Sequence, residues 1–187
     1  MGKIQLPQPV KLFIGILSAD CSFFKIAEEK LSSIFGPIDL KTNPEGIPFT
    51  FSNYYDREMG TGIKRLFLSF RKLINPENIS SIKIKTNELE DVIAKETKSN
   101  VVRPVNLDPG YLSANKVLLA TTKDYSHRIY LRDGIYSEIT LQYRSSASGG
   151  KKGFQPMAWT YPDYQTQAYL DFFYQMREIY LNKTPKN

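Results

Sequence analysis

The dipeptide Asp133-Gly134 lies between two runs rich in isoleucine, tyrosine and leucine, His127 to Arg132 and Ile135 to Tyr143. A two-residue Asp-Gly connection is a strong signal for a type I′ turn, because both residues tolerate a positive φ. The sequence therefore predicts an antiparallel β-hairpin at this point. The rest of the chain has to be compatible with a sheet that includes it.

A two-residue turn also fixes the register of the predicted hairpin. His127 and Glu138 become diagonal neighbours on one face, within reach of each other's side chains. Arg128, Tyr130 and Arg132 are then expected on the opposite face. Because both faces mix polar and apolar residues, two interpretations stay open. The hairpin is either a solvated edge or the floor of a polar pocket in which His127 titrates near neutrality.

The elements expected before the hairpin alternate between strand and helix. A helix is expected over 24–34, ended by Gly36-Pro37, and another from Asn75-Pro76 to about residue 98. Strands are expected over 11–17, 49–55, 63–70 and 101–107. The resulting order, βαββαβ, is that of ferredoxin-like folds. Residues 82–85 alternate in polarity, so a short strand there is the alternative to helix.

The remaining segments extend this core. Asp108-Pro109-Gly110 is expected to form a sharp turn, and residues 111–122 are either a short helix or a strand. A flexible loop is expected over 145–153, and a last helix over about 163–182, with Thr160 and Asp163 at capping-box spacing. The prediction is an α+β fold, mainly antiparallel, as a single domain over residues 1–187.

Charge and cysteine content narrow the classes of partner. The net charge of +6 favours anionic partners weakly, since the 25 lysines and arginines are spread along the chain. Cys21 is the only cysteine, which excludes an internal disulfide and fits a reducing compartment. No apolar run is long enough for a secretory signal or a membrane span. We therefore expect a cytoplasmic protein without a membrane partner.

Several catalytic signatures are absent from the sequence. It has no phosphate-binding P-loop, no Gly-x-Gly-x-x-Gly and no Gly-x-Ser-x-Gly elbow. A single histidine, His127, excludes the two-histidine helical zinc motif, and no metal site is predicted. No cofactor is indicated by the sequence.

The polar stretch from Asn106 to Tyr143 holds the candidate site. Asp108 either bonds its own turn or binds a cation or acts as a general base. His127 and Glu138 are candidates for proton transfer with Asp108, and Lys123 and Arg128 for binding a phosphate or carboxylate. The other ligand-binding candidates are Asn106, Tyr111, Tyr125, Tyr130 and Trp159.

Segments spread over nearly the whole chain resemble one prokaryotic family, domain of unknown function 4416. They are 11–17, 54–60, 69–70, 106–112, 120–131, 134–141 and 159–164. The resemblance implies no activity, cofactor or site residue. Members are sometimes labelled GTP-binding, but this chain lacks the P-loop, and Thr122-Lys-Asp124 is one residue short of the guanine-binding Thr-Lys-x-Asp.

The leading functional hypothesis is a protein that binds, or acts on, an anionic small molecule or nucleotide. The alternative is an RNA-binding or protein-interaction module that uses the sheet face and its tyrosines. A third interpretation is purely structural, with each polar cluster acting only in capping, turning or packing.

Overall fold

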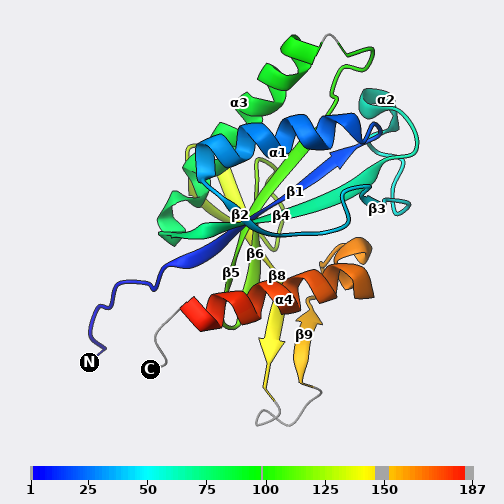
Figure 1. Cartoon of the computed structure of the whole chain (residues 1–187). Coiled ribbons are helices and arrows are strands. Elements are labelled where there is room, and N and C mark those ends of the chain that lie inside the picture. The colour runs from blue at the N-terminus through cyan, green and yellow to red at the C-terminus, as the bar shows by residue number, and fades with distance from the viewer. Residues whose placement is uncertain (1, 98, 146–151, 184–187) are drawn as a thin grey trace.

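The computed structural model describes residues 2–97, 99–145 and 152–183. One antiparallel sheet runs through the molecule, with strands in the order β2-β4-β1-β5-β6-β8-β7, while β3 pairs with β4 and β9 with β8. Helices α1 and α3 lie on one side of the sheet and α4 on the other (Figure 1). The α+β class and the antiparallel sheet are confirmed. Most of the predicted loop at 145–153 lies outside the described residues.

The strands are β1 (Val10–Ser18), β2 (Ile38–Lys41), β3 (Ile47–Pro48), β4 (Lys64–Ile74), β5 (Asn106–Ser113), β6 (Lys116–Thr121), β7 (Ile129–Arg132), β8 (Ile135–Arg144) and β9 (Gly153–Pro156). The helices are α1 (Ser22–Phe35), α2 (Asp56–Met59), α3 (Ile79–Thr97) and α4 (Gln167–Lys183), with 3₁₀ turns at Pro76–Asn78 and Pro162–Gln165. No helix in the described part of the chain is long and apolar enough to cross a membrane.

Two apolar cores lie on the two sides of the sheet. One packs α1 and α3 against residues such as Ile14, Ile16 and Leu107, and the other packs α4 against Phe13 and Phe67. All nine residues of β1 are buried, because this strand lies near the middle of the sheet with helices on both sides. Burial on both faces accounts for its almost continuous apolar sequence.

Several predicted elements are present. The helix expected after Asn75 exists as α3, with Asn75 accepting a hydrogen bond from the Glu77 amide, and residues 82–85 are helical rather than extended. Residues 116–121 are a strand, which settles the ambiguity over 111–122. At the hairpin, Asp133 and Gly134 have φ of 56° and 74°, as a type I′ turn requires.

Other predictions are wrong. Residues 49–55 are not a strand; the strand at this edge is β2, in which Ile38, Leu40 and Lys41 pair with β4. The strand expected over 101–107 begins only at Asn106, so Asp108-Pro109-Gly110 lies inside β5 and is not a turn. Gly110 serves close packing there, because an added Cβ would lie 2.5 Å from Phe13 Cζ. The Asp-Pro-Gly pattern misleads because a strand paired on one side also tolerates proline.

The hairpin register also differs from the expected one. An irregularity between Tyr130 and Arg132 places Tyr130 opposite Tyr136, where uninterrupted pairing would place it opposite Ser137. Strand β7 starts only at Ile129, so His127 and Arg128 precede it and are not bound by strand alternation. The predicted separation of these two residues onto opposite faces therefore has no structural basis.

Candidate functional site

Strands β5 and β6 are paired only from Gly110 onward along β5. β5 pairs with β1 from Asn106 to Leu112, but its pairing with β6 begins only at Gly110. Between the two strands, Leu107 bonds instead to helix α3. Its amide donates to Glu90 Oε1 at 2.7 Å, and its carbonyl accepts from Lys83 Nζ at 2.8 Å. Helix α3 thus takes the place of the missing strand and keeps the gap in the sheet open.

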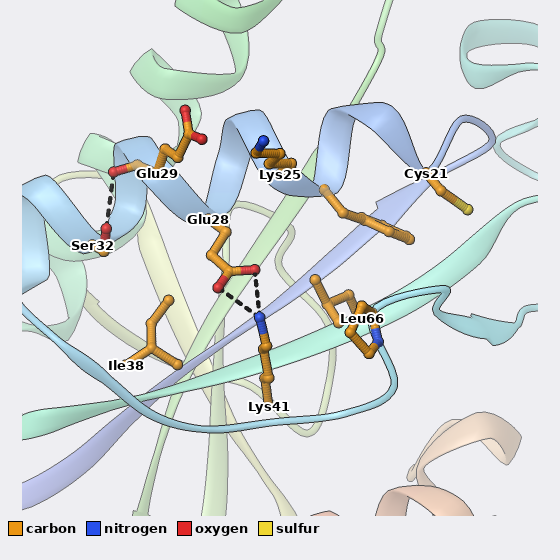
Figure 2. A pocket seen from close by; sticks show the side chains of 10 residues that line it. Cys21, Lys25, Glu28, Glu29, Ser32, Ile38, Lys41 and Leu66 are labelled. Atoms are coloured by element: carbon orange, nitrogen blue, oxygen red, sulfur yellow. Dashed lines mark hydrogen bonds and ion pairs between the residues drawn. The ribbon is translucent and has the colours of Figure 1, made fainter.

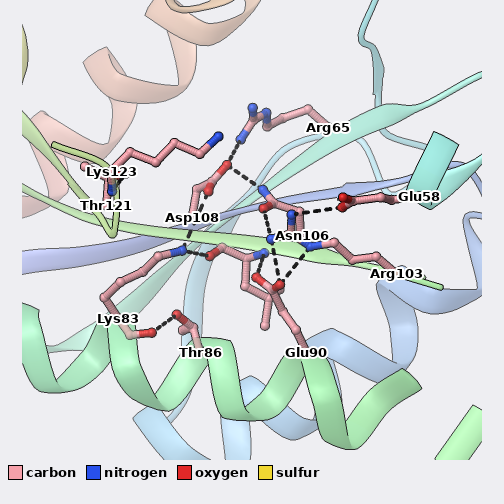
Figure 3. A network of polar contacts seen from close by, with 11 residues as sticks. Glu58, Arg65, Lys83, Thr86, Glu90, Arg103, Asn106, Asp108, Thr121 and Lys123 are labelled. Carbon is pink, nitrogen blue, oxygen red and sulfur yellow. Dashed lines mark hydrogen bonds and ion pairs between the residues drawn. The ribbon is translucent and has the colours of Figure 1, made fainter. Parts of the chain in front are cut away.

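Asp108 is the centre of a polar network in this gap (Figure 3). Its Oδ2 accepts hydrogen bonds from Arg65 Nη1 at 3.0 Å and from Asn106 Nδ2 at 2.8 Å. Asn106 accepts in turn from the Arg103 guanidinium. The other oxygen, Oδ1, has Lys83 Nζ at 3.9 Å. Because Asp108 is 26% exposed at its side chain, that oxygen remains open to a ligand.

Arg65 links Asp108 to a second carboxylate, that of Asp163, which lies 3.4 Å from Arg65 Nη2. The guanidinium is buried and packs over the ring of Tyr164. Gly15 leaves the space that it fills, since a Cβ on Gly15 would lie 2.8 Å from Arg65 Nη1. Asp163 is therefore part of this network and no helix cap.

The pKa values of the two carboxylates beside Arg65 are shifted in opposite directions. Burial would raise the pKa of Asp108, but the positive charges of Arg65, Lys83 and Arg103 outweigh it and the pKa is lowered. Burial raises the pKa of Asp163, and Arg65 offsets this only in part. Asp108 is thus the firmly ionised member of the pair at neutral pH.

A second cluster surrounds Glu138 on β8. Its Oε2 lies 3.0 Å from His127 Nε2 and accepts a hydrogen bond from Arg128 Nε at 2.8 Å. The predicted contact between His127 and Glu138 is confirmed. The predicted placement of Arg128 on the opposite face is wrong, since both residues reach the same carboxylate oxygen from the loop before β7.

The two clusters share one face of the sheet. Glu138 lies opposite Leu119, Leu119 lies opposite Gly110, and Gly110 is two residues from Asp108 on the same strand. Directly paired residues, and residues two apart, point to the same side of a sheet. Asp108 and Glu138 are therefore on the α4 side, along one cleft of about 560 Å³.

The charged residues of this cleft are mostly paired with one another. The cations are Arg65, Lys83, Arg103, Lys123 and Arg128, and the carboxylates are Glu90, Asp91, Asp108, Glu138 and Asp163. Within the described part of the chain, Lys123 is the one cation of the cleft without a carboxylate within 4.0 Å. Its Nζ instead lies 3.2 Å from the Tyr54 hydroxyl and 4.4 Å from the centre of that ring.

Three tyrosines that line this cleft are more than half exposed. Tyr54, Tyr125 and Tyr161 are 64%, 61% and 52% exposed and come from three different loops. Large exposed aromatic side chains around a polar cleft provide planar surfaces for a ligand ring. No group of three His, Cys, Asp or Glu side chains suited to a metal ion occurs among the residues described.

Four predicted site residues do not line the cleft. Tyr111 is 9% exposed and packs in the core, and Tyr130 lies on the exposed edge strand β7. Trp159 donates its indole N–H to the Ile139 carbonyl and stacks on His127, with ring centroids 5.2 Å apart. His127 itself contacts two residues that line the cleft, Glu138 through its Nε2 and Tyr125 with ring centroids 5.9 Å apart.

Several residues that line the cleft are not predicted from the sequence. Arg65, Lys83, Glu90, Arg103 and Asp163 come from separate elements and carry no common motif. The capping box predicted for Thr160 and Asp163 is not formed. The Thr160 hydroxyl instead accepts a hydrogen bond from the Met157 amide and donates one to the Thr140 carbonyl. The one signal that could have been used is Arg65 itself, an arginine directly before the apolar run Leu66 to Leu68 of β4.

A larger hollow of about 640 Å³ lies between α1 and β2 (Figure 2). Two of its polar side chains are paired, with Lys41 Nζ donating to Glu28 Oε1 at 2.9 Å. Cys21 lies at one end, beside the backbone of Glu45. Among the described residues, none that line this hollow carries a buried polar side-chain atom without a partner, whereas Glu138 does, so the Asp108–Glu138 cleft is the better candidate.

One protein family matches most of the chain. Residues 8–180 match the family described as domain of unknown function (DUF4416). The chain belongs to this family. No curated protein and no solved structure matches the chain. All residues that line the cleft, from Phe49 to Tyr164, lie within the part that matches DUF4416.

Proposed function

We propose that this DUF4416 protein binds an anionic small molecule with a planar ring, a nucleotide being the class that fits best. The observation that carries the proposal is the position of Lys123. It is the cleft cation without a carboxylate partner among the described residues, and Tyr54, Tyr125 and Tyr161 lie around the same cleft. The cleft as a whole is close to neutral, so attraction for an anion is local to Lys123.

The proposed binding mode assigns each group one role. Lys123 donates a charge-assisted hydrogen bond to the phosphate of the ligand, and the exposed tyrosine rings contact the planar ring of the ligand. Asp108 offers its open Oδ1 to a hydroxyl of the ligand, while Arg65 and Asn106 hold its other oxygen. His127 and Arg128 orient Glu138. The proposal is one of binding and includes no reaction.

The observations favour this over RNA binding through the sheet face. Both faces of the sheet are covered over the central strands, one by α1 and α3 and the other by α4. The exposed tyrosines of the cleft belong to loops and not to a stacking platform on the sheet.

We also infer a ferredoxin-like unit within a single domain. The order β2-β4-β1-β5, with every neighbour antiparallel, and the placement of α1 and α3 on one side support it. The strands from β6 onward then extend this unit along one edge. A cytoplasmic location belongs to the same proposal and is supported by the single cysteine, which is free.

The test is binding of AMP and adenosine to the wild type and to Lys123→Ala, measured by calorimetry. We expect Lys123→Ala to weaken AMP binding about 10–100-fold, the range of a hydrogen bond to a charged group, and to leave adenosine binding unchanged. Lys95→Ala removes an exposed charge from α3 outside the cleft and is the matched control. Equal loss in both variants, or no AMP binding by the wild type, would contradict the proposal.

A further inference from the structure

Glu138 carries a buried oxygen that the protein leaves unbonded. The residue is 3% exposed and lines the cleft. Its Oε2 is engaged by His127 and Arg128, whereas its Oε1 has no hydrogen-bond partner among the described residues. An unsatisfied buried carboxylate oxygen costs free energy unless a donor arrives from elsewhere.

The partners of Oε2 determine what Oε1 accepts. Arg128 has only N–H donors, so its contact at 2.8 Å fixes the carboxylate with one oxygen turned toward the guanidinium. Arg128 is itself held by the Lys123 carbonyl at 3.0 Å. The free oxygen is therefore held in a defined place, and the guanidinium that holds the carboxylate also bonds the loop that carries Lys123. A carboxylate oxygen accepts hydrogen bonds and donates none.

We propose that Glu138 Oε1 accepts a hydrogen bond from an amino group on the ligand's ring. This inference rests on the proposed function and narrows its ligand class. The ligand is a nucleotide whose base carries an exocyclic amine, such as adenine or cytosine. The matching bases in which a carbonyl replaces the amine place an acceptor against the carboxylate. Such a mismatch leaves both groups without a hydrogen bond.

Two ligand pairs isolate this contact. AMP and IMP differ in that IMP has a carbonyl where AMP has its amino group, as do CMP and UMP. Binding is measured by calorimetry for all four. We expect the wild type to bind the amino member of a pair about 10–100-fold more tightly, the range of a hydrogen bond to a charged group.

Glu138→Gln should invert this preference. Arg128 still requires an acceptor, so the amide carbonyl takes the place of Oε2 and the amide NH₂ takes the place of Oε1. The cleft then presents a donor where it presented an acceptor. IMP or UMP should gain affinity relative to its amino counterpart. Circular dichroism and a thermal melt establish that the variant is folded.

Glu90→Gln is the matched control, because Glu90 lines the same cleft but both its oxygens are bonded, one to the Leu107 amide and one to Arg103. We expect it to leave the ratio of amino to carbonyl ligands unchanged. Equal binding of both members of each pair by the wild type would overturn the inference, even if Glu138→Gln fails to fold. An equal change of the ratio in Glu90→Gln would also overturn it. Failure of all four nucleotides to bind would instead contradict the proposed function.

Discussion

Asp39 and Asp108 are two carboxylates of the same sheet, and each is held by a cation that reaches across one intervening strand. Lys11 of β1 reaches across β4 to Asp39 of β2, with Nζ–Oδ distances of 2.7 and 2.8 Å. Arg65 of β4 reaches across β1 to Asp108 of β5. In both cases the intervening strand carries a small residue, Ser69 or Gly15.

The two networks differ in how completely they are satisfied. Asp39 accepts from Lys11 and Ser69 at Oδ1 and from Lys11 and Lys183 at Oδ2. Lys11 uses its third proton on the Phe70 carbonyl. Asp108 has one oxygen bonded twice, and the other has no donor closer than Lys83 Nζ at 3.9 Å among the residues described. We therefore expect the Asp39 network to stabilise the fold and have no part in binding. The Asp108 network should stabilise the fold less and leave one oxygen available to bind a ligand.

The largest expected effect tests whether the Asp39 network is structural. Lys11→Met removes a fully buried cation and leaves Asp39 with Lys183, which is partly exposed. Breaking a buried ion pair on one side should lower the free energy of unfolding by about 3–5 kcal/mol. Urea denaturation measures this, and Lys183→Ala, expected to cost less than about 1 kcal/mol, is the control. AMP affinity of the folded fraction should not change. A change in affinity would erase the distinction between the networks.

A smaller effect is expected from Gly15→Ala, which acts on the other network. The new methyl group would meet Arg65 Nη1 at 2.8 Å and the Phe67 ring at 3.0 Å, so the guanidinium has to shift away from Asp108. Overpacking of this kind should cost about 1–3 kcal/mol in urea denaturation. Here AMP affinity should fall as well, measured by calorimetry. Loss of stability with unchanged affinity would show that Arg65 does not position the site.

The smallest effect concerns pH and has opposite signs at two carboxylates. Burial raises the pKa of folded Asp163, so its ionisation opposes folding above the unfolded value of about 3.9. Asp163→Asn should therefore gain stability relative to the wild type as the pH rises from about 4 to 7, and this gain should vanish below about pH 4. Thermal melts from pH 3 to pH 7 would measure it.

The control at Asp39 should behave in the opposite way. Burial alone would raise the pKa of Asp39, but hydrogen bonds from Lys11, Lys183 and Ser69 outweigh it and lower the pKa. Its ionised form therefore stabilises the fold above about pH 3.9, and this contribution is lost as the pH falls through the folded pKa. Asp39→Asn should be less stable than the wild type at neutral pH, and the difference should shrink in acid. The same sign in both variants would contradict the assignment.

Local sequence patterns predicted the elements whose signals are also local. The Asp133-Gly134 turn, the helix start at Asn75-Pro76 and the apolar strand β1 depend on neighbouring residues alone. The Asp108-Pro109-Gly110 segment has an equally strong local signal, but pairing with β1 and the close approach of Phe13 to Gly110 override it. Strand β2 is only four residues long, which is too short to show a period.

The candidate site was predictable only in part for the same reason. His127 and Glu138 are joined by a hairpin, so their spacing in the sequence implied their contact. Arg65 and Asp163 are 98 residues apart and meet because the turn before α4 packs against β4, with Tyr164 beside Phe67. Which of the many charged side chains lie together depends on strand order, and strand order is set by packing of the whole sheet.

Helix α3 is bonded to Leu107 through Glu90 and Lys83. We therefore expect the Leu107 amide to exchange its hydrogen by a different motion from the amides of β1. The amide hydrogen of Leu107 bonds a side chain and not a neighbouring strand. Its exchange with deuterium therefore depends on the undocking of one helix, whereas amides of β1 depend on opening of the sheet. We expect the α3 wall of the cleft to open separately from the strands beneath it. A ligand that enters by this route should slow exchange at Leu107 first.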